Sequence, residues 1–173
     1  MPSHPSIQTI TPNDKDQTPR YPTTSIFLAG TTEFATWRGT FLAVLEGLYL
    51  AGEANPPPYP STTVYDPFQP NWTGDWREDL GDGRFRAQVE WELERQDGAA
   101  VVAFFLDERS RSPVSLLELG LCARSGKAVV GCERGYWKRG NVQAVCQRYG
   151  VPMADDLNGL VTLVADKLKG MKA

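Results

Sequence analysis

Glu118 is the residue of this 173-residue chain whose surroundings best suit chemistry. It lies in the segment 112–121, shortly after the apolar run 99–106. That run has the continuous hydrophobicity of a strand buried on both faces of a parallel sheet. Ligands of open α/β sheets bind beyond the carboxyl ends of the strands. A carboxylate at this place is therefore positioned to attack a substrate or to transfer a proton.

Two interpretations of Glu118 compete. Ser112 can cap a helix whose first turn contains Pro113, and Ser115 with Glu118 fits a capping box, in which the glutamate reaches back to the helix start. Gly120 favours the reactive interpretation, because a glycine inside a helix costs about 1 kcal/mol relative to alanine. Such a cost suggests that a ligand approaches the backbone near Glu118. The surrounding leucines lower the local dielectric and make the carboxylate sensitive to its partners.

A second group of candidates lies in the irregular segment 66–76, which follows a predicted short strand. It combines Asp66, Phe68, Asn71 and Trp72. Aromatic faces can stack on a heterocyclic base, and carboxylate or amide groups can pair with polar edges or sugar hydroxyls. The segment is thus a candidate ligand wall. The alternative is a rigid surface loop in which Trp72 fills the core.

Glu92 is a candidate second carboxylate on the predicted helix 84–96. The apolar residues expected to share the inner face of that helix are Phe85, Val89 and Leu93. Glu92 is one residue from that face and can turn toward the sheet edge, where it would shuttle a proton to a leaving base. A solvated surface charge is the alternative.

Composition excludes several classes of site. The only histidine is His4, so one chain has no core Ser-His-Asp or Cys-His site. The cysteines Cys122, Cys132 and Cys146 are odd in number and lack metal-ligand spacing, which indicates reduced thiols and no metal. A net charge of −3 gives no general attraction to nucleic acid or anionic membranes. No apolar run suits a bilayer span or a signal peptide, and we expect a cytoplasmic protein.

The pattern of elements predicts a polar, disordered N-terminal tail over 1–22 and one α/β domain over 23–173. The expected strands are 24–30, 62–65, 99–106 and 127–132, and the expected helices are 37–50, 84–96, 113–125, 141–149 and one starting at Asp155 or Asp156. Their alternation indicates a parallel sheet with helices on both faces and right-handed crossovers. Gly30 forms the turn after the first strand, and Asn141 is expected to cap the short helix, although its amide is also a candidate for the site.

Several of these segments together resemble the nucleoside 2-deoxyribosyltransferase-like family. The resemblance covers roughly residues 25 to 150. Its motifs are Ile26-Phe27-Leu28-Ala29-Gly30, Asp66-Pro67-Phe68 through Trp72, Trp91-Glu92, Ser115-Leu116-Leu117-Glu118-Leu119-Gly120, Ser125-Gly126-Lys127 and Gly140-Asn141-Val142. It rests on the order of these motifs in the α/β pattern. The resemblance implies a flavodoxin-like or Rossmann-like fold and a homo-oligomer, either a dimer or a larger assembly.

The same resemblance implies roles for individual residues. Glu118 would be the nucleophile that attacks the anomeric carbon, and Glu92 would lie near the acidic residue that contacts the base. Phe27 and Ala100 stand where many relatives carry tyrosine and aspartate. We expect Ser112 or Ser115 to replace the hydrogen bonds that are lost.

The expected activity is cleavage of the N-glycosidic bond of a nucleoside or nucleotide, with transfer of the sugar to a free base and no cofactor. A carboxylate beside the sugar can stabilise and then capture an oxocarbenium-like centre. The alternatives are a nucleoside or nucleotide N-glycoside hydrolase, a non-catalytic nucleotide-sensing module and a plain interaction domain.

Overall fold

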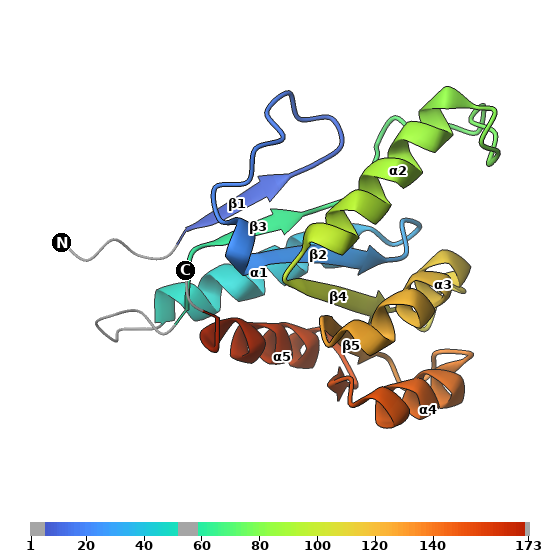
Figure 1. The fold of residues 1–173 in the computed structure, drawn as a ribbon. Coiled ribbons are helices and arrows are strands. Elements are labelled where there is room, and N and C mark those ends of the chain that lie inside the picture. The colour runs from blue at the N-terminus through green and yellow to red at the C-terminus, as the bar shows by residue number, and fades with distance from the viewer. Residues whose placement is uncertain (1–5, 52–58, 172–173) are drawn as a thin grey trace.

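A six-stranded parallel sheet forms the centre of the protein in the computed structural model, which describes residues 6–51 and 59–171 (Figure 1). The strands follow the order β1-β3-β2-β4-β5-β6. Their bounds are β1 Ile7–Ile10, β2 Ser25–Gly30, β3 Thr62–Tyr65, β4 Val101–Leu106, β5 Ala128–Cys132 and β6 Met153–Ala154. Without β1, this order is that of the flavodoxin-like sheet, and the predicted fold class is confirmed.

Helices cover both faces of the sheet (Figure 1). One apolar cluster lies under α1 and α5, and the other lies under α2, α3 and α4. The helices are α1 Thr36–Ala51, α2 Gly83–Gly98, α3 Pro113–Cys122, α4 Arg139–Tyr149 and α5 Leu157–Lys169, with short 3-10 turns at Pro22–Thr24 and Ala123–Ser125. Successive residues of β2 point to opposite faces, so Leu28 enters one cluster and Phe27 the other.

Strand β1 corrects the expectation of a disordered tail over 1–22. Ile7–Ile10 pairs in parallel with β3, and Ile10 is buried against the sheet. The polar composition of this region hid the strand, because one side chain of the four is fully buried. Residues 1–5, including His4, lie outside the described residues, as does the proline-rich stretch up to residue 58.

The inward face of α2 differs from the apolar face that its sequence predicts. Leu93 is 44% exposed, whereas Gln88 and Gln96 are buried. The helix runs beside a cavity that several charged side chains line, which is described below, and its glutamine and glutamate side chains turn inward. Hydrophobic periodicity alone gives the wrong rotation for a helix in such a place.

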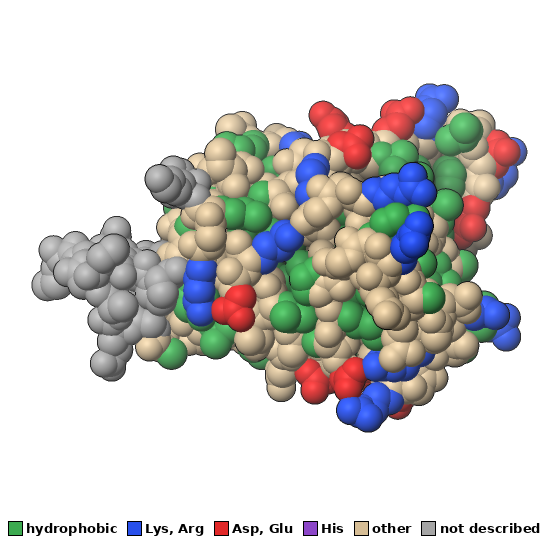
Figure 2. Space-filling view, turned by 60° about the horizontal axis from the view of Figure 1, so that its bottom comes forward, with side chains coloured by type: hydrophobic (Ala, Val, Ile, Leu, Met, Phe, Trp, Pro, Cys, Tyr) green, Lys and Arg blue, Asp and Glu red, His purple; other side chains and the backbone are tan. Residues whose placement is uncertain are grey.

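The surface in Figure 2 carries both signs of charge. Lysine, arginine, aspartate and glutamate side chains are interspersed with apolar patches over this face, among the residues drawn in colour. Within the described part of the chain, no helix is long and apolar enough to cross a membrane, and no cluster of histidine, cysteine or carboxylate side chains could hold a metal ion.

Candidate functional site

A cavity of about 850 Å³ lies at the carboxyl ends of β2, β3 and β4. It is lined by the segments that follow these strands, together with side chains from α1, α2 and α3. The strand order changes direction between β2 and β4, and this is where flavodoxin-like sheets bind ligands. The volume lies within the range of small-molecule sites.

Gly30 ends β2 at the edge of this cavity, and its lack of a side chain has a packing reason. A Cβ atom there would lie 2.7 Å from the carbonyl oxygen of Phe105 and 2.7 Å from the ring of Trp37. The carbonyl oxygen of Gly30 accepts a hydrogen bond of 3.1 Å from Nη2 of Arg38. Glycine thus lets α1 pack closely on the strand end.

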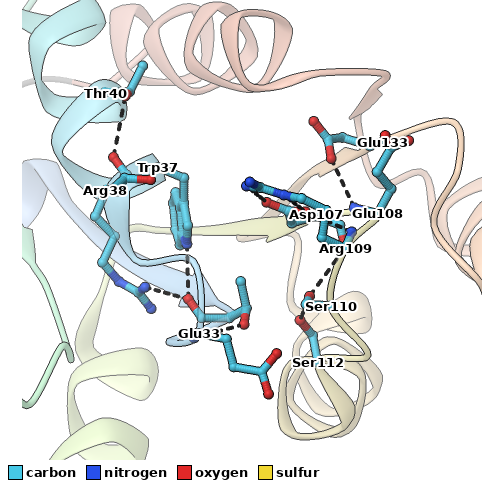
Figure 3. A network of polar contacts seen from close by, with 12 residues as sticks. Glu33, Trp37, Arg38, Thr40, Asp107, Glu108, Arg109, Ser110, Ser112 and Glu133 are labelled. Atoms are coloured by element: carbon cyan, nitrogen blue, oxygen red, sulfur yellow. Dashed lines mark hydrogen bonds and ion pairs between the residues drawn. The ribbon is translucent and has the colours of Figure 1, made fainter.

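Arg38 is a buried cation in the cavity wall, with a side chain 3% exposed. Figure 3 shows its guanidinium beside the loop after β2, near Trp37. Its Nη1 donates to the carbonyl oxygen of Thr31 at 2.7 Å, and so does Nε1 of Trp37 at 3.1 Å. Its Nε lies 3.0 Å from Oδ1 of Asp66. Burial lowers the pKa of Arg38, but an arginine keeps its charge across the range in which proteins fold.

Glu118 projects from α3 into the same cavity and is 8% exposed. Its Oε1 accepts a hydrogen bond from Nε2 of Gln96 on α2. The pKa of Glu118 is raised to about 7: burial is the main cause and the charge of Glu92 adds to it, while the hydrogen bond from Gln96 and the charge of Arg38 oppose the rise. The contact with Gln96 rules out the capping box, since the carboxylate faces α2 and not the start of its own helix.

Glu92 lies on α2 and lines the cavity too, so its interpretation as a surface charge is wrong. Its Oε1 accepts a hydrogen bond of 2.8 Å from Nε2 of Gln88. Burial raises the pKa of Glu92, and the bond from Gln88 and the charge of Arg38 act against that rise. A buried and a partly buried carboxylate, both with raised pKa values, thus share one cavity, an arrangement typical of acid–base sites.

The segment after β3 supplies an aromatic wall. Phe68 and Trp72 line the cavity. Trp72 is 37% exposed and stacks on Trp76 at 5.1 Å, with Phe85 edge-on at 5.8 Å. The side chain is therefore not a core plug. Its ring is fixed by aromatic neighbours and remains open to a ligand.

Asp66 and Asn71 do not line the cavity, although the sequence suggested both. Asp66 pairs with Arg38 behind the wall. Asn71 is exposed, and its backbone N–H donates to Oε1 of Gln69. Asn141 also lies outside the lining. It is the third residue of α4 and is exposed, and Lys138 occupies the position before the helix where Asn141 had been expected.

The segment after β4 brings Ser112 and Ser115 to the cavity, together with Arg109 and Arg111. Figure 3 shows Asp107, Arg109, Ser110 and Ser112 in this turn. Oγ of Ser112 lies 2.7 Å from Oγ of Ser110 and makes no capping bond to α3. Ser112 has a left-handed backbone with φ of 43°, which is uncommon for serine. Ser112 thus occupies the predicted position before α3, with Pro113 in the first turn, but its side chain does not cap the helix.

Gly120 lies in open space on the surface of α3, whereas the sequence had suggested a close contact there. A Cβ atom there would meet no other atom within 4 Å, and the residue is exposed on α3. It lies two residues from Glu118, so the helix turns it away from the cavity. Gly120 does not line the cavity, and no packing within the described part of the chain requires a glycine there.

Sequence reasoning missed Arg38 and the glutamines of α2. Arg38 follows Trp37 and comes three residues before Phe41, all buried on α1. A single arginine inside an otherwise apolar stripe was the available signal. Gln88, Glu92 and Gln96 recur every four residues, a spacing that places them on one helix face.

Comparison with protein families matches residues 23–136 to the family described as nucleoside 2-deoxyribosyltransferase like. The match spans more than half of the chain and includes the elements from β2 to β5. The chain belongs to this family. No curated protein matches it. Within this nucleoside 2-deoxyribosyltransferase-like protein, β1 and Asn141 lie outside the matched range, whereas Glu92 and Glu118 lie inside it.

Proposed function

We propose that this protein transfers a deoxyribosyl group from a nucleoside to a free base through a sugar ester on Glu118. The observation that carries the proposal is that Glu118, which is buried, and Glu92, which is partly buried, line one cavity beyond the central strands of a chain from this family. The reaction needs one carboxylate that attacks and one acid that serves the base, and the cavity supplies both.

In the first half of the reaction, a carboxylate oxygen of Glu118 bonds to C1′ of the sugar as the bond between C1′ and the base nitrogen breaks. The electron pair of the broken bond goes to the base, and Glu92 gives it a proton. In the second half, a nitrogen of the incoming base bonds to C1′ as the bond between C1′ and the Glu118 oxygen breaks, and its electron pair returns to the carboxylate. The base gives its proton to Glu92, so both groups regain their first state.

The division of roles requires a proton on Glu92 and a negative charge on Glu118. Burial raises the pKa of Glu92, which favours its acid form. Burial also raises the pKa of Glu118, to about 7, which works against its charged form. Arg38, buried beside the cavity, favours the single negative charge.

The aromatic wall supports a base as the leaving group. Phe27, Phe68 and Trp72 all line the cavity. Flat heterocycles stack on such rings with little dependence on their identity. A transferase must accept two different bases in turn, which this kind of wall permits.

The test is a panel of purine and pyrimidine 2-deoxynucleosides, each incubated with and without a second free base. We expect new nucleosides to form only when the acceptor base is present, and Glu118→Gln to abolish their formation. A slow 2-fluoro-2-deoxy analogue should add the mass of its sugar to the peptide that contains Glu118. Release of base without exchange would assign a hydrolase. Ligand-induced thermal stabilisation without any turnover would assign a nucleotide-sensing module and overturn the proposal.

A further inference from the structure

Gln96 makes a contact with Glu118 that no feature of the sequence had indicated. Its Nε2 donates a hydrogen bond to Oε1 of the glutamate. Gln96 is 9% exposed and Glu118 is 8% exposed, so water does not compete freely for this contact. Among the residues that the structure describes, Gln96 is the one side chain that donates a hydrogen bond to this carboxylate.

The other candidates for this contact do not make it. Phe27 has no hydroxyl group, and its ring packs near that of Trp91 at 6.3 Å. The hydroxyl of Ser112 bonds to Ser110 instead. Ser115 is buried on α3, but no hydrogen bond joins it to Glu118 in the described part of the molecule. The expected replacement by a serine is therefore not found, and α2 supplies the donor.

The position of Gln96 is fixed by the same helix face that positions Glu92. Gln88 donates from Nε2 to the carbonyl oxygen of Pro67 at 2.9 Å and to Glu92 at 2.8 Å. Gln96 follows Glu92 by four residues and therefore lies one turn further along that face. The register of α2 thus sets both carboxylates relative to the strand ends.

We propose that Gln96 is a positioning residue, which fixes one carboxylate oxygen of Glu118 and leaves the other free to attack the sugar. That Glu118 attacks the sugar rests on the proposed function, whereas the fixed orientation of its carboxylate rests on the geometry. A carboxylate on two rotatable bonds has several orientations, and an amide donor on a neighbouring helix selects one of them. Glutamine also remains uncharged, so it does not neutralise the nucleophile.

Gln96 should also affect the titration of Glu118. The groups that face this carboxylate are Glu92 from α2, Arg38 from α1 and, on its own helix, the thiol of Cys122. A hydrogen bond to the charged form lowers a pKa, and here it opposes burial. Loss of a hydrogen bond to a charged group should raise the pKa of Glu118 by about 1 to 2 units above its value of about 7.

The experiment compares the wild-type protein with Gln96→Met, which keeps the length of the side chain and removes the amide. The titration of Glu118 is followed by NMR of ¹³C-labelled glutamate carboxyls without substrate, with Glu118→Gln used to assign the signal. The dependence of kcat/KM on pH is measured with the deoxynucleoside and acceptor that the panel selects. Gln143→Met, an exposed substitution on α4, is the matched control.

We expect Gln96→Met to shift both the acid limb of the kcat/KM profile and the titration of the Glu118 carboxyl to higher pH. At pH values below the limb the rate should fall roughly 10- to 100-fold, and the loss should shrink toward alkaline pH. Gln96→Asn, whose amide is one methylene too short, should shift both curves in the same direction. Gln143→Met should shift neither.

An unchanged titration in folded Gln96 variants would overturn the proposal, and so would a loss of rate that is equal at every pH. Failure of both Gln96 variants to fold would assign the residue a structural role and also overturn it. The NMR measurement needs no turnover. A shifted titration in a protein without transferase activity would therefore refute the proposed function while retaining the link between Gln96 and Glu118.

Discussion

Nε of Arg38 lies 3.0 Å from Oδ1 of Asp66, which joins α1 to the start of the segment that forms the aromatic wall. Within the described ranges, the N–H of Nε has no aligned hydrogen-bond acceptor, so the contact is an ion pair held by charge. The Arg38 side chain is 3% exposed and that of Asp66 is 16% exposed. Asp66 thus affects the cavity through the arginine rather than by touching a ligand.

Asp66→Ala should destabilise the protein by about 3 kcal/mol, because it leaves a buried arginine without its counter-charge. Urea unfolding of the variant and of the wild type measures the change. Asp75→Ala is the control, since the pair formed by Asp75 and Arg84 is exposed and its loss should hardly change the unfolding midpoint. Equal unfolding midpoints for Asp66→Ala and the control would show that the ion pair with Asp66 is not needed to keep Arg38 buried.

Glu118→Gln should stabilise the fold at neutral and alkaline pH. Burial raises the pKa of Glu118 from an ordinary 4.5 to about 7, so the folded state loses stability as the pH rises through this interval. The neutral amide avoids that loss. The variant should be more stable than the wild type by up to about 3 kcal/mol above pH 7, and the difference should vanish near pH 4.5.

The measurement is urea unfolding of both proteins at a series of pH values from about 4 to about 8. Glu90→Gln is a matched control, because that glutamate is exposed on the outer face of α2. If the difference in unfolding free energy between Glu118→Gln and the wild type does not change with pH, burial of the charged carboxylate does not destabilise the fold.

The central strands and Glu118 could be predicted from sequence because each carries a local signal. The run before Glu118 is apolar throughout, as a strand covered on both faces must be, and it forms β4. The segment 62–65 is bounded by prolines and forms β3. Asp156 caps α5 by accepting a hydrogen bond from the backbone N–H of Gly159, as its position before an apolar stripe indicated.

The features that escaped prediction depend on contacts between distant segments. Strand β1 exists because β3 offers an edge, and its own sequence is polar on one side. Gln88 and Gln96 turn inward to bond the carbonyl oxygen of Pro67 and the carboxylate of Glu118. Their spacing places them on one face of α2, but it does not reveal that this face is the buried one. Arg38 is buried because the carbonyl oxygens of Gly30 and Thr31 and the carboxylate of Asp66 meet it.

Trp72→Ala should weaken substrate binding more than it weakens the fold. The ring lines the cavity but is more than one third exposed, so its removal leaves the core intact. Stacking of a base on an aromatic ring contributes about 1–3 kcal/mol, which corresponds to a roughly 5- to 150-fold rise in KM. Steady-state kinetics and thermal melting of the same preparation provide both quantities.

Tyr149→Ala provides the comparison for Trp72→Ala, because Tyr149 is an exposed aromatic residue on α4 outside the cavity lining. It should leave KM unchanged. A large fall in the melting temperature of Trp72→Ala together with an unchanged KM would assign Trp72 to packing against Trp76 and Phe85.

Deletion of residues 1–20 should destabilise the protein, because this region contributes an edge strand and a contact to the wall of the site. The deletion removes the buried side chain of Ile10 from the sheet, and β3 keeps its pairing with β2 but loses β1 and becomes the edge strand. The Oε1 of Gln17 accepts a hydrogen bond of 2.9 Å from Nε1 of Trp91, whose ring packs near Phe27 at the cavity. We expect a lower melting temperature and faster amide hydrogen exchange in β3.

Two point variants separate the strand from the rest of the deleted region. Ile10→Ala should reproduce part of the loss, since truncation of a buried isoleucine costs about 2–5 kcal/mol. Lys15→Ala, in the exposed loop after β1, should have no effect. If the deletion leaves both the melting temperature and the exchange of β3 unchanged, β1 adds nothing to the stability of the sheet. A normal melting temperature with altered kinetics would instead place the whole effect on the contact between Gln17 and Trp91.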